Sequence, residues 1–387
     1  MVNFYLILTG NMVQTIKRIK ILFTIPNFDT AGSGKALLKV AKGLDALLFD
    51  AHICCMHTRG YFFKEVEKSG LPIHIVQYTT PMKPYGKGLW NCFKISKKLK
   101  AINPDIIHSF HYAPDYSEAL AAKLAGVKWI YTKKNMNWGG NSKNGWKLRT
   151  FLASAVIAQN TDMIERFFKN TKHVYLVPRG VDTQEFVPTN PSEKLRNQWG
   201  LKNNNRVIIC VANLVPVKGV EIVINAFSKI AHKHTDWVLM VVGDNQNKYG
   251  EVLKKLTKDL GLLNRIIFTG KQFNVNEYLN LSEVFVLPTL NKGRMEGSPV
   301  SLLEAMACKK NVLASNIPGI KDQLKEFPNH LIEAGNVEAW KTALEYVFLN
   351  TILENKNAGE LLRKHVLNNY QIEKEIENCE KMYKKHN

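Results

Sequence analysis

Residues 284–304 read VFVLPTLNKGRMEGSPVSLLE, and this stretch predicts a strand, a loop and a helix in succession. Its first residues, 284–288, are apolar and end at a proline, as is typical of a buried strand in a parallel sheet. Ser298 is a favourable helix cap, and Pro299 is a favourable first helical residue. The helix is therefore predicted to begin at this point.

Two glutamates flank the start of the predicted helix. Its first backbone N–H groups, at Val300 and Ser301, have no partner within the helix and would bind an anion. Glu296 lies in the preceding loop, whereas Glu304 lies within the helix with its side chain tilted back towards the N-terminal end. Carboxylates on both sides of an anion site suit a nucleotide sugar, which carries hydroxyl groups on both sides of a diphosphate. The alternative is that each glutamate is solvated and binds nothing.

The rest of the chain alternates strand-like and helix-like segments, which predicts an α/β fold with parallel sheets covered by helices. The predicted strands are residues 19–25, 51–57, 73–77, 106–110, 129–132, 155–159 and 174–177, and then 207–212, 237–242, 265–268, 284–287 and 311–314. The predicted division is an N-terminal extension (1–16), a Rossmann-like domain (17–187), a linker around one short helix (188–204), a second Rossmann-like domain (205–365) and a C-terminal helix (366–387). Doubly wound sheets bind ligands at the carboxyl ends of their strands, so we expect the site in the cleft between the domains.

A glycine-containing loop follows the first predicted strand of the N-terminal domain. Gly32, Ser33 and Gly34 lie in this loop, before a helix predicted from Lys35 to Leu48. The sequence is not a P-loop, because that motif requires glycine where Asp29 stands and serine or threonine at the position after Lys35. The glycines either allow a ligand to approach the backbone or simply form the turn.

The charge of the chain is concentrated in its N-terminal half. The net charge is +20 over 387 residues, and residues 1–180 hold 26 Lys and Arg against 10 Asp and Glu, whereas the remainder holds 27 against 23. A basic domain can bind nucleic acid, an anionic membrane or an acidic substrate. Residues 83–100 combine six lysines with Leu89, Trp90 and Phe93 in a helical amphipathic pattern, which fits either a helix lying on a lipid surface or a packed helix with a solvated basic face.

No transmembrane helix is predicted. The first apolar stretch, residues 4–8, is too short to span a bilayer or to form a signal-peptide core, and Met12 is an alternative start. The six cysteines are interpreted as reduced thiols. We therefore expect a cytoplasmic protein, with peripheral membrane association left open.

Several segments of the second half form a series of motifs in one order along the chain. They are residues 211–219 (VANLVPVKG), 242–244 (VGD), 287–289 (LPT) and 296–307 (EGSPVSLLEAMA). In order and spacing they resemble the motifs of the retaining GT-B glycosyltransferases of family 4, also described as glycosyl transferases group 1. The resemblance continues weakly through residues 32–34, 104–108 and 178–182, and it covers most of residues 17–380.

This resemblance implies a GT-B fold, in which two Rossmann-like domains face each other across a cleft and the C-terminal helix crosses back to the N-terminal domain. It also implies a nucleoside diphosphate sugar as donor, with Lys218 binding the diphosphate, Glu296 holding the sugar hydroxyls and Glu304 the ribose. The donor-binding residues implied are Gly32, Ser33, Gly34, Asn213, Lys218, Gly243, Lys271, Arg294, Glu296, Gly297, Ser298, Pro299, Val300, Ser301 and Glu304. No Asp-x-Asp occurs in the chain, so neither a metal nor another cofactor is expected.

The sequence departs from the family pattern at Asn213, near which an arginine normally shares the diphosphate with the lysine. Arg294 and Arg179 are the candidates to supply that charge instead. The turn after the signature helix also differs, because residues 308–311 (CKKN) replace the usual Gly-x-Pro.

The acceptor side is expected on the basic N-terminal domain. The family places a histidine near the reacting sugar, and the catalytic set implied is His111, Lys218 and Glu296; His108 is the second candidate histidine, closer to the strand and more consistent with a structural role. Lys133, Lys134 and Asn135 follow another strand end, where a histidine is more usual. Those residues either meet an anionic acceptor or form a solvated turn.

The function predicted is transfer of a sugar from a UDP- or GDP-sugar to a glycan or lipid-linked acceptor with retention of configuration, in synthesis of a surface polysaccharide, lipopolysaccharide or glycolipid. One alternative is a nucleotide-sugar 2-epimerase of the same fold, against which the spacing of Glu296 and Glu304 argues. The other is a basic nucleic-acid-binding protein. No recognisable nucleic-acid motif accompanies the basic residues, so nucleic acid is not expected as a partner.

Overall fold

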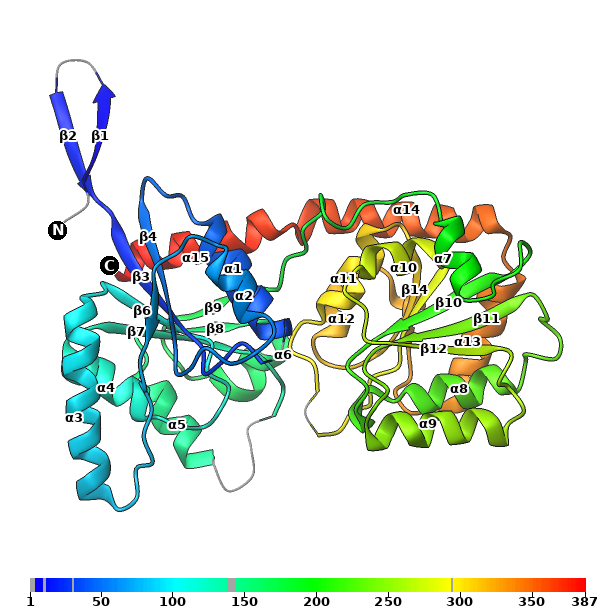
Figure 1. Ribbon diagram of the computed structural model, residues 1–387, viewed down its shortest axis with the longest axis horizontal. Helices are drawn as coiled ribbons and strands as arrows, with labels where there is room; N and C mark the ends of the chain where they lie inside the picture. The colour runs from blue at the N-terminus through cyan, green and yellow to red at the C-terminus, as the bar shows by residue number, and fades with distance from the viewer. Residues whose placement is uncertain (1–3, 10–11, 30, 138–142, 294) are drawn as a thin grey trace.

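The structure, a computed structural model, describes residues 4–9, 12–29, 31–137, 143–293 and 295–387. It consists of two α/β domains side by side, with the last two helices running along both of them (Figure 1). Each domain contains one parallel sheet with helices on both faces. The two doubly wound domains expected from the sequence are confirmed.

The N-terminal domain is built on a seven-stranded parallel sheet. Its strands, in spatial order, are β5 (Ile73–Ile75), β4 (Phe49–Cys55), β3 (Ile19–Thr24), β6 (Ile106–Ser109), β7 (Lys128–Lys133), β8 (Ala155–Ala158) and β9 (Val174–Leu176). The order reverses between β3 and β6, so the carboxyl ends of these two strands open a crevice. A separate antiparallel hairpin, β1 (Phe4–Thr9) and β2 (Met12–Lys17), precedes this sheet and occupies the predicted N-terminal extension.

The C-terminal domain is built on a six-stranded parallel sheet. Its strands, in spatial order, are β12 (Ile266–Gly270), β11 (Trp237–Val242), β10 (Arg206–Val211), β13 (Val284–Leu287), β14 (Asn311–Ser315) and β15 (Leu331–Ile332). The order reverses between β10 and β13. The sequence predicted every one of these strands except the two-residue β15.

Helices cover both faces of each sheet, which buries apolar residues of both faces. In the N-terminal domain they are α1 (Ala31–Gly43), α2 (Phe63–Glu67), α3 (Tyr85–Ile102), α4 (Ser117–Ala125), α5 (Lys143–Leu152), α6 (Thr161–Met163) and the π-helical turn η2 (Ile164–Phe168). In the C-terminal domain they are α7 (Glu193–Gln198), η3 (Pro216–Lys218), α8 (Val220–Ser228), α9 (Lys248–Asp259), α10 (Val275–Leu281), α11 (Val300–Ala307), α12 (Ile320–Gln323), η4 (Pro328–His330) and α13 (Val337–Leu349). Phe23 of β3, for example, packs into the core beneath α1, whereas its neighbour Leu22 packs beneath α3 and α4.

The chain crosses between the domains twice. The predicted linker, residues 188–204, packs against the second domain, because Leu195 and Leu201 are buried in its core. Near the C-terminus, α14 (Ile352–Asn369) packs on the second domain, and α15 (Ile372–His386) returns to the first, where Tyr383 is buried in the core (Figure 1). The predicted crossing of the C-terminal helix is therefore confirmed.

Within the described residues, no helix combines the length and the hydropathy that a membrane span needs.

Candidate active site

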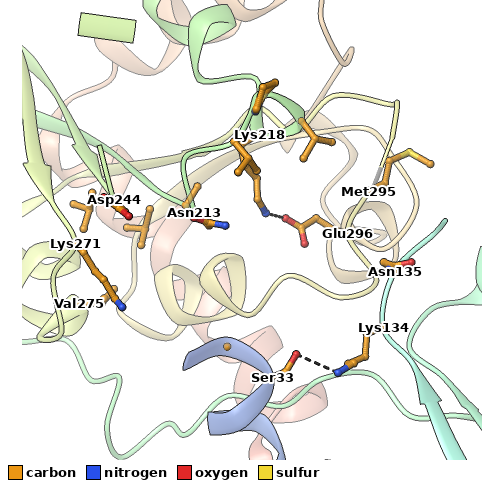
Figure 2. A pocket seen from close by; sticks show the side chains of 18 of the residues that line it. Ser33, Lys134, Asn135, Asn213, Lys218, Asp244, Lys271, Val275, Met295 and Glu296 are labelled. Atoms are coloured by element: carbon orange, nitrogen blue, oxygen red, sulfur yellow. Dashed lines mark hydrogen bonds and ion pairs between the residues drawn. The ribbon is translucent and has the colours of Figure 1, made fainter. Parts of the chain in front are cut away.

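A large cleft lies between the two domains, at the carboxyl ends of their strands (Figure 2). Its volume is about 1070 Å³. Residues from both domains line it: Asp29, Gly32, Ser33, Tyr112, Lys134 and Asn135 on one side, and Val211, Ala212, Asn213, Val215, Pro216, Val217, Lys218, Val242, Gly243, Asp244, Lys271, Gln272, Val275, Met295 and Glu296 on the other. This cleft is where the doubly wound topology predicts a ligand.

An ion pair between Lys218 and Glu296 lies on the C-terminal wall of the cleft. Lys218 is at the end of η3, after β10, and Glu296 is in the loop after β13, so the pair spans the point where the sheet order reverses. Gly219, which follows the lysine, has a φ of 62° and lies against the carbonyl oxygen of Pro288. Only glycine fits both that φ and that space, so the backbone after Lys218 is held against the start of the β13 loop.

Backbone pairing across the domain boundary holds the Glu296 loop in place. Asn135 and Glu296 form an antiparallel β-bridge, and the N–H of Met136 donates to the carbonyl of Met295 at 3.3 Å. The side chain of Asn160 donates to the carbonyl of Gly297 at 2.6 Å. Glu296 is therefore positioned by both domains, although it belongs to the second.

The contact at Gly297 allows a test of this arrangement. A Cβ at residue 297 would overlap the carbonyl oxygen of Lys134 and would lie 2.8 Å from Oε1 of Gln159. We expect Gly297→Ala to displace the Glu296 loop and to lower kcat by about 10²-fold, since small misplacements of reacting groups have effects of this size. The control is Gly261→Ala on the surface, where φ is 69° and no atom lies within 4 Å, which carries backbone strain but no clash. Equal activities of the two variants would contradict the prediction.

The predicted glycine loop is in fact the first turn of α1, so this prediction is wrong in its secondary structure. The helix begins at Ala31, and Gly32 and Ser33 line the cleft. Gly34 does not, because its Cα faces the rings of Phe28 and Phe62. The first turn of α1 therefore lines the cleft at the place where a loop was expected.

The predicted start of α11 is also shifted. Pro299 occupies the cap position with a φ of −71°, and Ser298 does not cap the helix. Instead, the Ser298 hydroxyl accepts hydrogen bonds from Gln323 Nε2 at 3.0 Å and from the N–H of Arg179 at 3.3 Å. Ser298 is therefore a structural link and not a residue of the cleft wall.

The donor-binding residues predicted on α11 lie beside the cleft and not on its wall. Gly297 to Ser301 and Glu304 are absent from the lining of the cleft. Glu304 faces α1, where burial raises its pKa to about 7, and Lys35 partly opposes this increase. The ribose-binding role predicted for Glu304 stays a prediction.

The two candidate histidines are both buried. His108 is hydrogen-bonded to Tyr383 of α15 at 2.5 Å and to Thr132 at 2.8 Å, so both of its ring nitrogens are engaged within the protein. The structural role expected for it stays a prediction. The ring of His111 lies 6.1 Å from that of Tyr112, His111 is absent from the lining of the cleft, and its Nδ1 has no hydrogen-bond partner among the described residues. The catalytic role predicted for His111 stays a prediction. Burial, with nearby cationic side chains, lowers the pKa of each histidine to about 3, so both are neutral at physiological pH.

The neighbouring lysines at the end of β7, Lys133 and Lys134, have different surroundings. Lys133 is 1% exposed, and its ammonium donates to the carbonyls of Asn135 at 2.9 Å and Asn137 at 2.5 Å. Lys133 does not line the cleft, and the acceptor-side role predicted for it stays a prediction. Lys134 and Asn135 do line the cleft.

The charge missing at Asn213 does not come from Arg179. That guanidinium is buried and paired with Glu375 at 2.6 Å. Arg294, the other candidate, lies outside the described residues. Asn213, Gly243 and Lys271 all line the cleft, and the donor-binding role predicted for them stays a prediction.

Two family matches cover most of the chain. Residues 30–185 match the family described as Glycosyltransferase Family 4, and residues 191–364 match the family described as Glycosyl transferases group 1. The chain belongs to the GT-B glycosyltransferases of family 4.

Individual relatives agree with this assignment. This family 4 glycosyltransferase is 28% identical over 320 residues to the UDP-Gal:alpha-D-GlcNAc-diphosphoundecaprenol alpha-1,3-galactosyltransferase of Escherichia coli, with 77% of this chain and 79% of the relative covered. Its fold is similar to that of a glycosyltransferase from Rickettsia africae, with a TM-score of 0.82, 24% identity and coverage of 95% and 98%. It is also similar to Anabaena Alr3699/HepE in complex with UDP and glucose, with a TM-score of 0.80, 19% identity and coverage of 94% and 99%.

Sequence reasoning missed several residues of the glycosyltransferase cleft. Asp29, Tyr112, Asp244, Gln272 and Met295 line it without having been predicted as site residues. Asp244 and Tyr112 each lie just after a strand, which was a usable signal. Gln272 likewise lies two residues after β12, whereas Met295 lies deeper in its loop and had no such signal.

Proposed function

We propose that this glycosyltransferase transfers a sugar, with retention of configuration, from a UDP- or GDP-sugar to a glycan or lipid-linked acceptor of a cell-surface polysaccharide or glycolipid. The observation that carries the proposal is the Lys218–Glu296 pair in a cleft formed by both domains. In the structure, Lys218 and Glu296 neutralise each other. A bound donor would separate them, with its diphosphate taking Lys218 and its sugar hydroxyls donating to Glu296.

Charge on the leaving diphosphate grows during transfer, so a fixed ammonium stabilises the transition state more than the ground state. Gly32 and Ser33, in the first turn of α1, line the same cleft, and the N-terminal end of a helix carries positive potential. We infer that these groups take the role that a divalent cation has in other transferases. The described residues include no group of three or more His, Cys, Asp or Glu side chains placed to hold a metal ion. EDTA is expected to leave the rate unchanged, and a loss restored by Mg²⁺ would overturn this part of the proposal.

The name of the Escherichia coli relative supports a lipid-linked acceptor, because that enzyme acts on a diphosphoundecaprenol. The excess of basic residues in the N-terminal half is consistent with such an anionic acceptor. For the donor, the same relative uses UDP-Gal, and the Anabaena structure holds UDP.

The experiment that tests the function is a nucleotide-release assay over UDP- and GDP-sugars, with a bacterial lipid extract as acceptor and NMR of the product to assign the anomer. We expect one donor to be turned over with retention. Inversion would overturn the stereochemical proposal. Donor isomerisation without transfer would favour the 2-epimerase, and silence with every donor would overturn the enzymatic role.

Peripheral membrane binding has its own support on helix α3. Leu89, Trp90 and Phe93 are 52%, 57% and 42% exposed, so the aromatic face of the helix is not packed in the domain core. Lys94 lies over the Trp90 ring at 5.5 Å, and Lys97 over Phe93 at 4.7 Å. Exposed aromatic rings interleaved with lysines suit the interface of an anionic bilayer.

We therefore expect the protein to bind vesicles that contain phosphatidylglycerol, and the double variant Trp90→Ser/Phe93→Ser to bind them at least about tenfold more weakly. Tyr346→Ser, on the C-terminal domain, is the matched control because Tyr346 is 71% exposed. Vesicle co-sedimentation at low and high salt measures both. Equal binding of the two variants would contradict the α3 surface, and tighter binding to duplex DNA than to vesicles would favour the nucleic-acid alternative.

A further inference from the structure

Among the described residues, the C-terminal wall of the cleft carries two cationic side chains, Lys218 and Lys271. On the C-terminal wall, Lys218 is already paired with Glu296, and Asn213 carries no charge. Lys271 lies towards the other end of this wall, beside Asp244 and Val275 (Figure 2). A nucleoside diphosphate carries several negative charges, so a second cation close to Lys218 would strengthen its binding substantially.

Lys134 is the cation that faces this gap from the N-terminal domain. Its ammonium donates to Ser33 Oγ at 3.2 Å and to the carbonyl oxygen of Phe110. Figure 2 shows Lys134 and Ser33 on the wall opposite Asn213 and Lys218. Among the described residues, no carboxylate lies within ion-pair distance of the Lys134 ammonium, whose hydrogen-bond partners are neutral oxygens.

We propose that Lys134 binds the diphosphate of the donor across the cleft from Lys218 and supplies the positive charge that Asn213 lacks. This inference rests on the proposed function, because it assigns a further residue to the same donor site. The hydroxyl of Ser33 would orient the ammonium, as it does in the unliganded protein.

The backbone around Lys134 fixes it relative to the sugar site. Asn135, the next residue, forms the β-bridge with Glu296, and the carbonyl of Lys134 packs against Gly297. The loop that carries the ammonium is therefore the same loop that holds the Glu296 loop in place. A diphosphate bound by both Lys134 and Lys218 would link the N-terminal and C-terminal walls of the cleft.

The surroundings of Lys134 predict that the affinity for an anion depends on pH. The groups around it are the rings of Phe110 and Tyr112, the guanidinium groups of Arg149 and Arg179, and the neutral His108 and His111. Burial, with Arg179 and Arg149, lowers the pKa of Lys134 to about 7. Below this pKa the ammonium is charged and ready for an anion, whereas above it binding requires the uptake of a proton. Affinity for the anion should therefore fall as pH rises above 7, by up to about tenfold per pH unit.

The test is calorimetric titration of UDP and GDP into the full chain and three variants. For the nucleotide that binds, we expect Lys134→Met to weaken affinity by about 10- to 100-fold, Lys134→Arg to restore it to within a few-fold, and Lys64→Met, an exposed lysine outside the cleft, to change nothing. The Lys134→Arg variant should also lose the decline of affinity between pH 7 and 9. Ionisation of the nucleotide, and of Lys133 and Glu304 in the protein, affects the wild type and this variant alike, so the difference between them reports on Lys134.

Unchanged nucleotide affinity in Lys134→Met overturns this inference alone. A defect confined to the KM of a phosphorylated acceptor also overturns it, and would place Lys134 against the acceptor instead. If the wild-type protein binds neither nucleotide, the proposed function fails and this inference fails with it.

Discussion

Replacing Lys218 with Met is expected to lower kcat by about 10²- to 10³-fold, which is the cost of removing one group that stabilises developing charge in an enclosed site. The lysine side chain is only 17% exposed, and it lies at the reversal point of the sheet. Water can therefore provide only part of the stabilisation that the ammonium group gives to the developing charge. The replacement also leaves Glu296 without its partner, so a fall in donor affinity should accompany the loss of rate. Steady-state release of the nucleoside diphosphate measures both quantities.

The matched control is Lys229→Met, at the residue that follows α8. Lys229 also forms an ion pair, with Glu338 at 2.5 Å, but the two side chains are 48% and 65% exposed and lie outside the cleft. Surface pairs of this kind contribute little, so kcat should stay within about twofold of the wild type. A rate for Lys218→Met within tenfold of that of Lys229→Met would exclude the lysine from transition-state stabilisation.

The strands could be predicted closely because the sheets are parallel and covered on both faces. Such strands appear in the sequence as short apolar runs, and Trp237–Val242 and Val284–Leu287 were predicted to the residue. The short β15, Leu331–Ile332, was missed because two residues form no recognisable run.

The central pair of the cleft could also be predicted, for a topological reason. Lys218 and Glu296 follow β10 and β13, which are neighbours in the sheet although far apart in the chain. The carboxyl ends of neighbouring parallel strands bring the loops after them together. Resemblance to the family then identified which residues of those loops matter.

The direction of a side chain could not be predicted from the sequence where a contact with a distant residue determines it. Lys133 and Lys134 are adjacent and chemically identical, yet only the second lines the cleft, because the ammonium of the first is held by local carbonyls. Ser298 is a residue type that often caps helices, but its hydroxyl instead accepts hydrogen bonds from Gln323 and from the backbone of Arg179. His108 is fixed by Tyr383, a residue from the last helix.

That last helix provides the second large expected effect. Replacing Glu375 with Ala should lower the free energy of unfolding by about 3–5 kcal/mol and the midpoint of the first thermal transition by on the order of 10 °C. Both oxygens of the carboxylate are used: one accepts from Arg179 Nη1 at 2.6 Å and the other from the N–H of Gly180 at 2.7 Å. The side chains of Glu375 and Arg179 are 5% and 9% exposed. Removing the carboxylate therefore leaves a buried guanidinium and a buried N–H without their acceptors.

The position of the Glu375–Arg179 pair explains why the loss of stability should extend to the whole N-terminal domain. Beside it, Val181 and Gln371 form a parallel β-bridge, in which the N–H of Ile372 donates to the carbonyl of Val181 at 3.0 Å. Releasing Glu375 would loosen the start of α15, whose Tyr383 fills the core of the first domain. Glu251→Ala on α9 is the control, because its pair with Lys254 at 2.9 Å is exposed and should contribute below about 1 kcal/mol. Scanning calorimetry distinguishes the two cases: if both variants unfold at the wild-type temperature, α15 does not depend on Glu375, and packing alone holds the returning helix.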